Sequence, residues 1–226
     1  MVLRKHVELH NSVRDNMKSP IIWTFFIYKY DTIVLEVINM NIVIRKAKPE
    51  EAERIIDIGI EVWNTTYKDL IPQNIIDKLQ SKDEERIERN KVNIKERQNT
   101  FVAEVDGKIV GYNSFGKTRD ENFGNAGEIY AGYILDDYQG LGLGRKMAIE
   151  CMKEMLSQGY TTLVTKCLVG NPSNEFHKSL GGVYVGQSEF NPMGIHVGKE
   201  NIYFHEDLEK SLNYNIEKLK KKSFTL

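Results

Sequence analysis

The sequence lacks the features of disulfide-bonded, membrane-spanning and polyanion-binding proteins. It has two cysteines in 226 residues, too few for a disulfide framework, and they form no C-x-x-C pair. The formal net charge is −1, so nothing global favours nucleic acid or an anionic membrane as partner. No run approaches the roughly 18 apolar residues of a transmembrane helix. Cys151 and Cys167 fit small buried hydrophobic residues in a reducing compartment, so we expect a cytoplasmic protein.

The composition is that of an ordinary globular protein, with 41% hydrophobic and 28% charged residues. This is enough apolar material to form a hydrophobic core. We divide the chain into an N-terminal extension of uncertain role, residues 1–39, and a domain over residues 40–226. The extension carries the apolar segments 21–28 and 32–38, which fit an added hairpin, an interaction segment or upstream sequence before a start at Met40. His6 and His10 have the i, i+4 spacing of metal ligands on a helix, but no third ligand is near, so we expect no metal.

Periodicity and turn signals predict a mixed α/β domain. The Asp106-Gly107 pair marks a hairpin turn, and Pro49 opens a helix whose apolar stripe runs from Ile55 to Trp63. The strong charge of residues 82–97 is typical of a solvated helix. The expected strands are residues 41–47, 100–105, 108–115, 128–135, 161–169, 183–189 and 201–205; the expected helices follow Pro49 and cover 75–79, 82–97, 145–158, a short stretch after Pro172, and 206–222.

The central feature is a glycine-rich turn, residues 138–146, that joins a predicted strand to a predicted helix. The first N–H groups of a helix lack intrahelical partners and lie at the positive end of its dipole, so they form an anion site. Glycines let the backbone approach a phosphate closely. A pyrophosphate is therefore expected on the N–H groups from about Leu141 to Lys146, with the charges of Arg145 and Lys146 nearby.

Two nucleotide-binding patterns do not match this turn. A P-loop needs Lys and then Ser or Thr after its last glycine, whereas Arg145 follows Gly144. A dinucleotide fingerprint needs a third glycine where Met147 stands. These departures argue against a nucleotide-dependent regulator, which would bind ATP or NAD.

The pattern that does match is Q-x-x-G-x-G, formed by Gln139, Gly142 and Gly144. Here the sequence resembles the GNAT superfamily of acetyl-CoA-dependent N-acetyltransferases, of the bacterial type. Three further segments support the resemblance in the right order: W-x-x-x-Y…P at residues 63–72, the strand 128–135, and N-x-x-x-x-F-H at residues 171–177. The resemblance covers residues 41–212 and implies a central mixed, mostly antiparallel sheet with splayed middle strands, flanked by helices.

The resemblance also implies where acetyl-CoA, the cosubstrate, would lie. It would occupy the gap between strands 128–135 and 161–169, with the pantetheine arm paired to the backbone of Ile134 and Leu135. The N–H of Tyr133 or of Ile134 would stabilise the oxyanion. Asn171 would bond the pantetheine or the sulfur side, and Lys178 would approach the ribose phosphate. The pyrophosphate would rest on the turn formed by Gln139, Gly140, Leu141, Gly142, Leu143, Gly144, Arg145 and Lys146.

The reaction asks for a base, an oxyanion site and a proton for the leaving thiolate. Glu128 is the candidate base, with a solvated or hydrogen-bonded strand carboxylate as the alternative. His177 stands where the family usually has a tyrosine and is the candidate acid. Tyr133 is a second candidate acid. Positioning of amine and thioester without a dedicated acid is also open.

Trp63 and Tyr67 are expected to line the acceptor side, or to pack the helix. The function implied is acetyl transfer to a primary amine of a small molecule or peptide, by direct attack in a ternary complex. Alternatives are acetylation of protein N-termini or lysines, and a non-catalytic acyl-CoA-binding module. Residues 65–73, 119–126 and 187–200 would set specificity. A monomer and a homodimer are both compatible with the sequence.

Overall fold

The computed structural model describes residues 40–223. The N-terminal extension is outside this range. The predictions for its segments 21–28 and 32–38 and for His6 and His10 therefore concern residues that the structure does not describe. Within it, seven strands form one sheet in the order β1-β2-β3-β4-β5-β7-β6. They are β1 Ile42–Lys46, β2 Thr100–Val105, β3 Lys108–Lys117, β4 Gly127–Ile134, β5 Leu163–Leu168, β6 Val183–Phe190 and β7 Gly198–His205.

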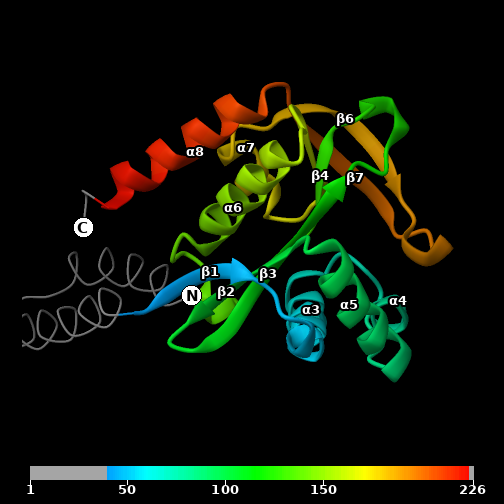
Figure 1. The fold of residues 1–226 in the computed structure, drawn as a ribbon. Coiled ribbons are helices and arrows are strands. Elements are labelled where there is room, and N and C mark those ends of the chain that lie inside the picture. The colour runs from blue at the N-terminus through cyan, green and yellow to red at the C-terminus, as the bar shows by residue number, and fades with distance from the viewer. Residues whose placement is uncertain (1–39, 224–226) are drawn as a thin grey trace, which may run out of the picture.

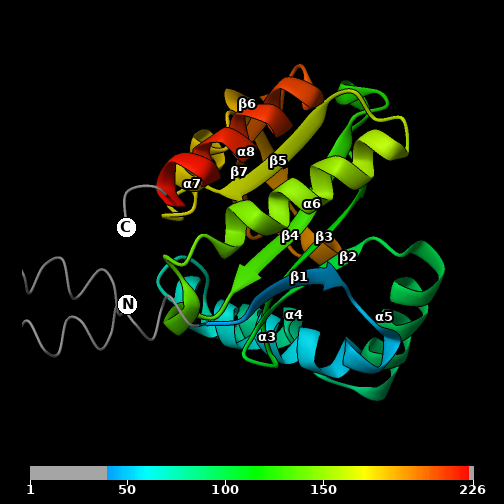
Figure 2. The ribbon, with the colours of Figure 1, turned by 60° about the vertical axis from the view of Figure 1, so that its left-hand side comes forward.

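The helices cover the two faces of this sheet (Figures 1 and 2). One face carries α3, α4 and α5, and the other carries α6, α7 and α8. Their bounds are α3 Ala52–Thr66, α4 Gln73–Leu79, α5 Glu84–Arg97, α6 Leu143–Ser157, α7 Asn174–Ser179 and α8 Leu208–Ser223. In residues 40–223 no helix is long and apolar enough to cross a membrane.

The central strands β4 and β5 are the parallel pair of a sheet whose other recorded pairings are antiparallel. Their pairing covers only three residue pairs, from Gly127 with Leu163 to Ile129 with Thr165. The register of β4 against β3 shifts directly after this stretch, so that Tyr130 is an extra residue in the β3–β4 pairing. A bulge of this kind bends its strand. The mixed, mostly antiparallel sheet with splayed middle strands is therefore confirmed.

Local chemistry explains why the elements lie where the sequence predicts them. Pro49 begins a 3-10 turn that leads into α3, and the stripe from Ile55 to Trp63 is buried. The turn between β2 and β3 places Asp106 and Gly107 at φ of 50° and 79°, as a two-residue hairpin requires. Of the side chains of α5, only Ile94 is buried, which confirms a solvated helix.

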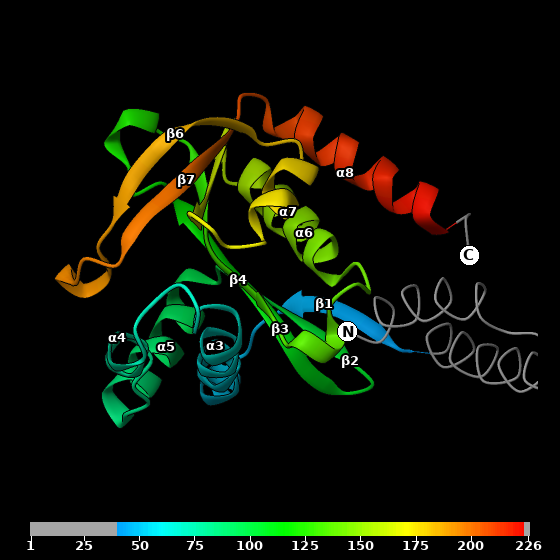
Figure 3. The same ribbon diagram turned by 180° about the vertical axis from the view of Figure 1, so that it is seen from behind.

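Helix α8 lies antiparallel to α6, and this orientation matters for the site. Leu208 at its start packs with Cys151 and Met155 near the end of α6. Asn215, one-half of the way along α8, accepts a hydrogen bond from Arg145 in the first turn of α6. The C-terminal end of α8 therefore lies beside the glycine-rich turn, as Figure 3 shows from behind.

Candidate active site

The gap between β4 and β5 exposes a backbone edge of β4. Hydrogen-bonded and non-hydrogen-bonded pairs alternate along an antiparallel ladder. The N–H of Leu135 donates to Val110 O at 2.9 Å, and Ile134 lies opposite Gly111 on β3. The N–H and C=O of Ile134 therefore point away from β3, into the gap. Of the two oxyanion donors expected from the sequence, Ile134 has this direction, while the N–H of Tyr133 points at β3.

Leu135 does not share this geometry. Its N–H is used by β3, and its carbonyl accepts a hydrogen bond from the N–H of Tyr138 at 2.9 Å. Its side chain is buried in the core cluster of Ile58, Val62 and Leu143. The expected pairing of a pantetheine arm with Leu135 is thus not available in this structure, because both backbone groups already have partners.

The glycine-rich turn has the backbone of an anion site. Gly142 caps α6 with φ of 79°, a conformation that favours glycine. The first intrahelical bond runs from Lys146 N–H to Gly142 O at 3.1 Å. The N–H groups of residues 143–145 precede that bond and lie at the positive end of the α6 dipole. The N–H of Lys146, by contrast, is used inside the helix.

Gly144 is required by close packing. A Cβ at this position would lie 3.0 Å from Cζ of Phe176 and 3.5 Å from Cδ1 of Ile134. Gly144 therefore lets α7 and β4 approach the start of α6. In this motif, Gly142 is needed for its positive φ angle, and Gly144 is needed because the packing leaves no room for a side chain.

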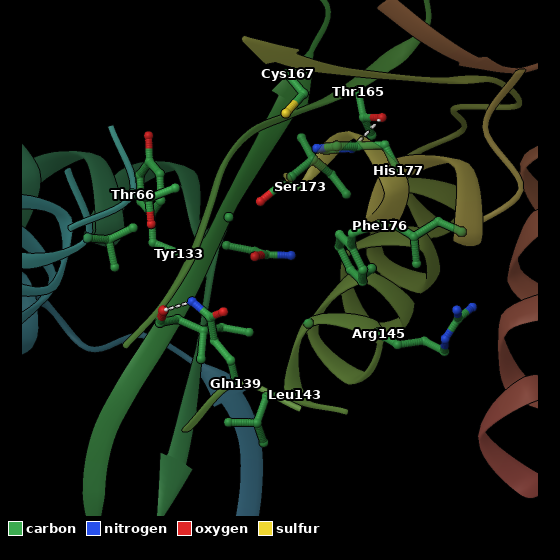
Figure 4. Close-up of a pocket in the computed structure, with 18 of the residues that line it drawn as sticks. Thr66, Tyr133, Gln139, Leu143, Arg145, Thr165, Cys167, Ser173, Phe176 and His177 are labelled. Atoms are coloured by element: carbon green, nitrogen blue, oxygen red, sulfur yellow. Dashed lines mark hydrogen bonds between the residues drawn. The ribbon is translucent and has the colours of Figure 1, made fainter. Parts of the chain in front are cut away.

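A cavity of ≈ 420 Å³ runs through the gap and joins this turn to the acceptor side (Figure 4). It is lined by β4, β5, α7, the start of α6 and the end of α3. Eleven expected site residues line it: Tyr67, Tyr133, Ile134, Gln139, Gly140, Gly142, Leu143, Gly144, Arg145, Asn171 and His177. Trp63, Glu128, Leu135, Leu141, Lys146 and Lys178 are not among its lining residues.

Two of the three expected phosphate cations, Arg145 and Lys178, have other partners. The guanidinium of Arg145 donates to Asn215 Oδ1, to Ser179 O at 3.0 Å and to Ser179 Oγ at 3.1 Å. In Figure 4 it is turned from the cavity toward α8. Lys178 is exposed and pairs with Glu175 at 2.6 Å. Arg145 therefore ties α6 to α7 and α8, and Lys178 belongs to the surface of α7.

Gln139 and Asn171 organise the loops at the two ends of the cavity. The amide of Gln139 donates to Ile134 O at 3.2 Å and to Asp136 Oδ1 at 3.0 Å. The Oδ1 of Asn171 accepts the N–H of Ser173 at 2.8 Å, a local turn that precedes α7. Both side chains fix backbone that lines the cavity.

His177 extends from α7 toward the cavity, near Cys167 (Figure 4). Its Nδ1 lies 2.9 Å from Oγ1 of Thr165, and its ring stacks on Tyr203 with centroids 5.5 Å apart. Burial lowers the pKa of His177 to about 4. The imidazole is therefore neutral at neutral pH, and the imidazolium acid expected from the sequence is not available there.

The acceptor end of the cavity is aromatic. Tyr133 accepts a hydrogen bond on its hydroxyl from Trp63 Nε1 at 2.9 Å, and Trp63 stacks on Tyr67 at 4.6 Å between centroids. Burial raises the pKa of Tyr133 and that of Tyr67, so both hydroxyls stay protonated. Trp63 is only 5% exposed and packs behind Tyr67 and Tyr133, whose side chains line the cavity.

Glu128 lies on β4 but is only 1% exposed. Its carboxylate accepts hydrogen bonds from Thr118 Oγ1 at 3.1 Å and from Arg119 N at 2.9 Å. It also forms a salt bridge with the guanidinium of Arg119. This is the hydrogen-bonded strand carboxylate that the sequence left as an alternative, and the structure does not bring Glu128 to the cavity surface.

Several lining residues were not identified from the sequence. Thr165, Cys167 and Phe176 all face the cavity. Burial raises the pKa of the Cys167 thiol to about 12, so it is an unreactive wall group. The alternation of β5 could have indicated Thr165 and Cys167, but only the fold shows which face of β5 meets α7. Residues 40–223 contain no group of three potential metal ligands.

Known proteins are similar to this chain in fold or in sequence. The fold is similar to PaiA N-acetyltransferase from Thermoplasma acidophilum, solved with coenzyme A (TM-score 0.55, 18% identity, 73% of this chain and 98% of that one). It is also similar to YncA from Salmonella typhimurium, solved with acetyl-CoA (TM-score 0.57, 22% identity, 74% and 95%). The uncharacterized N-acetyltransferase YuaI of Bacillus subtilis (strain 168) is 29% identical over 155 residues, 68% of this chain and 87% of the relative.

The fold, the open strand gap and the glycine turn are those of an N-acetyltransferase. The model of the acetyltransferase (GNAT) family matches residues 41–181, which is more than half of the chain. The protein belongs to that family, as the Q-x-x-G-x-G motif predicts.

Proposed function

We propose that the protein transfers an acetyl group from acetyl-CoA to a primary amine of a small molecule or peptide, by direct attack in a ternary complex. The observation that carries the proposal is the continuity of the cavity from the N-terminus of α6, through the β4–β5 gap, to Tyr67 and Tyr133. One end suits a pyrophosphate and the other suits an organic acceptor. A thioester held in the gap would lie between them.

The protein's part in holding acetyl-CoA follows from backbone groups that point into the gap; among these, the carbonyl of Ile134 also accepts the amide of Gln139. The pyrophosphate would accept hydrogen bonds from the N–H groups of residues 143–145. The pantetheine arm would add to β4 as a strand, using Ile134 and Gly132, whose backbone groups point into the gap. The helix dipole and these N–H groups would supply the electrostatic attraction for the pyrophosphate.

In the reaction, the amine nitrogen attacks the thioester carbonyl carbon. A C–N bond forms, the C–S bond breaks, the amine loses a proton and the thiolate gains one. The N–H of Ile134 would stabilise the developing oxyanion. Holding amine and thioester together across the gap supplies much of the remaining acceleration.

His177 would assist the leaving sulfur as a neutral donor. Thr165 is 1% exposed, so its hydroxyl hydrogen needs a partner inside the protein, and Nδ1 of His177 is the acceptor within reach. If Thr165 donates to Nδ1, the proton of the neutral ring is on Nε2. That Nε2–H would hydrogen-bond to the sulfur as negative charge develops there.

The cavity offers no carboxylate as a base. Its lining includes neither Asp nor Glu, and Glu128 is held by Arg119 and Thr118. We therefore propose that the amine reacts from its neutral form, after releasing its proton to water. Glu128 then acts in structure, by fixing the loop after β3.

A small acceptor is favoured over a folded protein by the covered acceptor side. Phe190 at the end of β6, and Ile195 and Val197 of the β6–β7 connection, pack against the cluster that contains Trp63 and Ile71. This packing places the β6–β7 connection beside residues of α3 and α4, as Figure 3 shows for α4. An acceptor side bordered by this connection would suit a small molecule or an extended peptide end.

The test is release of free thiol from acetyl-CoA in the presence of a panel of amines, with mass spectrometry of the products. We expect amine-dependent thiol release and an N-acetylated product for at least one small amine. Saturable acetyl-CoA binding with no product from small amines, peptides or proteins would instead support a non-catalytic acyl-CoA-binding module. Transfer to intact proteins alone would support the protein acetyltransferase alternative.

A further inference from the structure

The C-terminal end of α8 lies against the glycine-rich turn. A Cβ added at Gly142 would lie 4.0 Å from Cδ2 of Leu219. Leu208, Leu212 and Asn215 all face α6, and Leu219 continues the same helical stripe. Because α8 is antiparallel to α6, the residues around Leu219 stand beside the first N–H groups of α6.

This end of α8 is strongly basic. Lys218, Lys220 and Lys221 are exposed and adjoin Leu219 in the sequence, and we call these three lysines the α8 basic cluster. One acidic residue, Glu217, precedes them. Lys218 lies over the ring of Tyr214 at 5.4 Å from its centroid, which directs it along the outer surface of α8.

Two other cations near the turn, Arg145 and Lys178, have other partners. Arg145 donates to α7 and α8 through Ser179 and Asn215, and Lys178 pairs with Glu175. Backbone N–H groups at the start of α6 suffice for one pyrophosphate. The nucleotide of acetyl-CoA carries a further 3′-phosphate, and a dianion of this kind is bound best where positive side chains gather.

We propose, resting on the proposed use of acetyl-CoA, that the α8 basic cluster is the subsite for the 3′-phosphate of its nucleotide. The pyrophosphate binds the turn, and the nucleotide continues past Gly142 toward α8. The attraction of the cluster for this phosphate weakens with salt because the lysines are exposed. The subsite makes the protein discriminate acetyl-CoA from 3′-dephospho-acetyl-CoA.

The experiment measures Kd by calorimetry for both ligands, in wild type and in the variant Lys218→Gln/Lys220→Gln/Lys221→Gln. We expect wild type to prefer acetyl-CoA by about tenfold at low salt, and the variant to lose most of that preference while it binds 3′-dephospho-acetyl-CoA as wild type does. The matched control, Lys78→Gln/Lys91→Gln/Lys95→Gln on α4 and α5, lies on the other face of the sheet (Figure 2) and should keep the preference.

A second variant, Lys220→Gln/Lys221→Gln, leaves Lys218 on Tyr214 and should lose part of the preference. The inference is overturned if wild type binds both ligands equally, or if both α8 variants keep the wild-type preference. The lysines would then only stabilise the C-terminal end of α8 through its helix dipole. If wild type binds neither ligand, the proposed function itself fails, which is a different result.

Discussion

The Nδ1 of His177 lies 2.9 Å from the hydroxyl oxygen of Thr165, across the gap between α7 and β5. The two residues come from different elements and meet at the cavity. If Thr165 donates in this contact, as proposed above, the proton of the neutral His177 ring is on Nε2.

Replacing Thr165 by valine should therefore slow the reaction without weakening acetyl-CoA binding. Valine keeps the volume but removes the donor to Nδ1, so the ring is free to adopt the other tautomer. We expect kcat to fall about tenfold, with KM for acetyl-CoA changed by less than twofold. Thr165→Ser keeps the hydroxyl and should restore kcat to near wild type. Equal kcat for Thr165→Val and wild type would show that the contact only packs α7 onto β5.

The pH dependence of the reaction should follow the acceptor. Because no lining residue is a carboxylate, log(kcat/KM) for the amine should rise with a slope near one until the pKa of the amine, about 10.4 for a lysine-like amine. The pKa of His177, lowered to about 4 by burial, puts its own titration at the acidic end, so neutral His177 is present throughout. Two amines of different pKa provide the control, since the plateau should move with the amine. A plateau fixed near pH 7 for both would reveal a base on the protein.

Glu128→Gln separates a structural from a catalytic carboxylate. The amide keeps the shape but loses the charge opposite Arg119, so we expect a lower free energy of unfolding, by about 1 to 3 kcal/mol, and a fall in kcat of less than tenfold. A general base would cost about 10² to 10⁴ in kcat. Denaturant unfolding and steady-state kinetics on the same preparations provide both numbers. A large loss of kcat with unchanged stability would restore Glu128 as the base.

Arg145→Gln should act on the fold more than on the cosubstrate. Arg145 links α6 to Ser179 and Asn215. Because Asn215 is fully buried, removing the guanidinium of Arg145 leaves the Oδ1 of Asn215 without this donor. We expect destabilisation of about 1 to 3 kcal/mol, seen as a lower Tm without ligand. The increase in Tm on adding acetyl-CoA should remain. A normal Tm with no acetyl-CoA response would make Arg145 a direct phosphate ligand instead.

These predictions depend on details that the sequence could give only in part. Strand and helix positions follow from local signals, such as Asp106-Gly107 in the β2–β3 turn and the stripe from Ile55 to Trp63, because such signals act over a few residues. The glycine turn was identifiable because Gly142 and Gly144 have strict backbone and packing requirements. Strand β7 begins at Gly198, three residues earlier than predicted, because residues 198–200 join the ladder with the neighbouring strands and the side chain of Glu200 contacts Lys166 and Ser188.

The roles of charged and titratable residues were not predictable in the same way. The sequence does not show that Arg119 would neutralise Glu128, or that Asn215, seventy positions from Arg145, would accept its guanidinium. His177 has a normal pKa as an isolated residue, and only its burial against Tyr203 lowers it. Such contacts join residues far apart in the chain, so motif spacing carries no signal for them.

The most direct test of the account is the change in Tm caused by acetyl-CoA in wild type, Gly142→Glu and Gly107→Glu. Gly142 and Gly107 share a φ of 79°, so each substitution costs a similar backbone strain of about 1 to 2 kcal/mol, but only Gly142 lies at the cavity. At 100 times its Kd, acetyl-CoA should stabilise wild type and Gly107→Glu by about 2.7 kcal/mol, and should leave Gly142→Glu unchanged. An equal shift in all three proteins, or none in wild type, would contradict the placement of acetyl-CoA on the α6 turn.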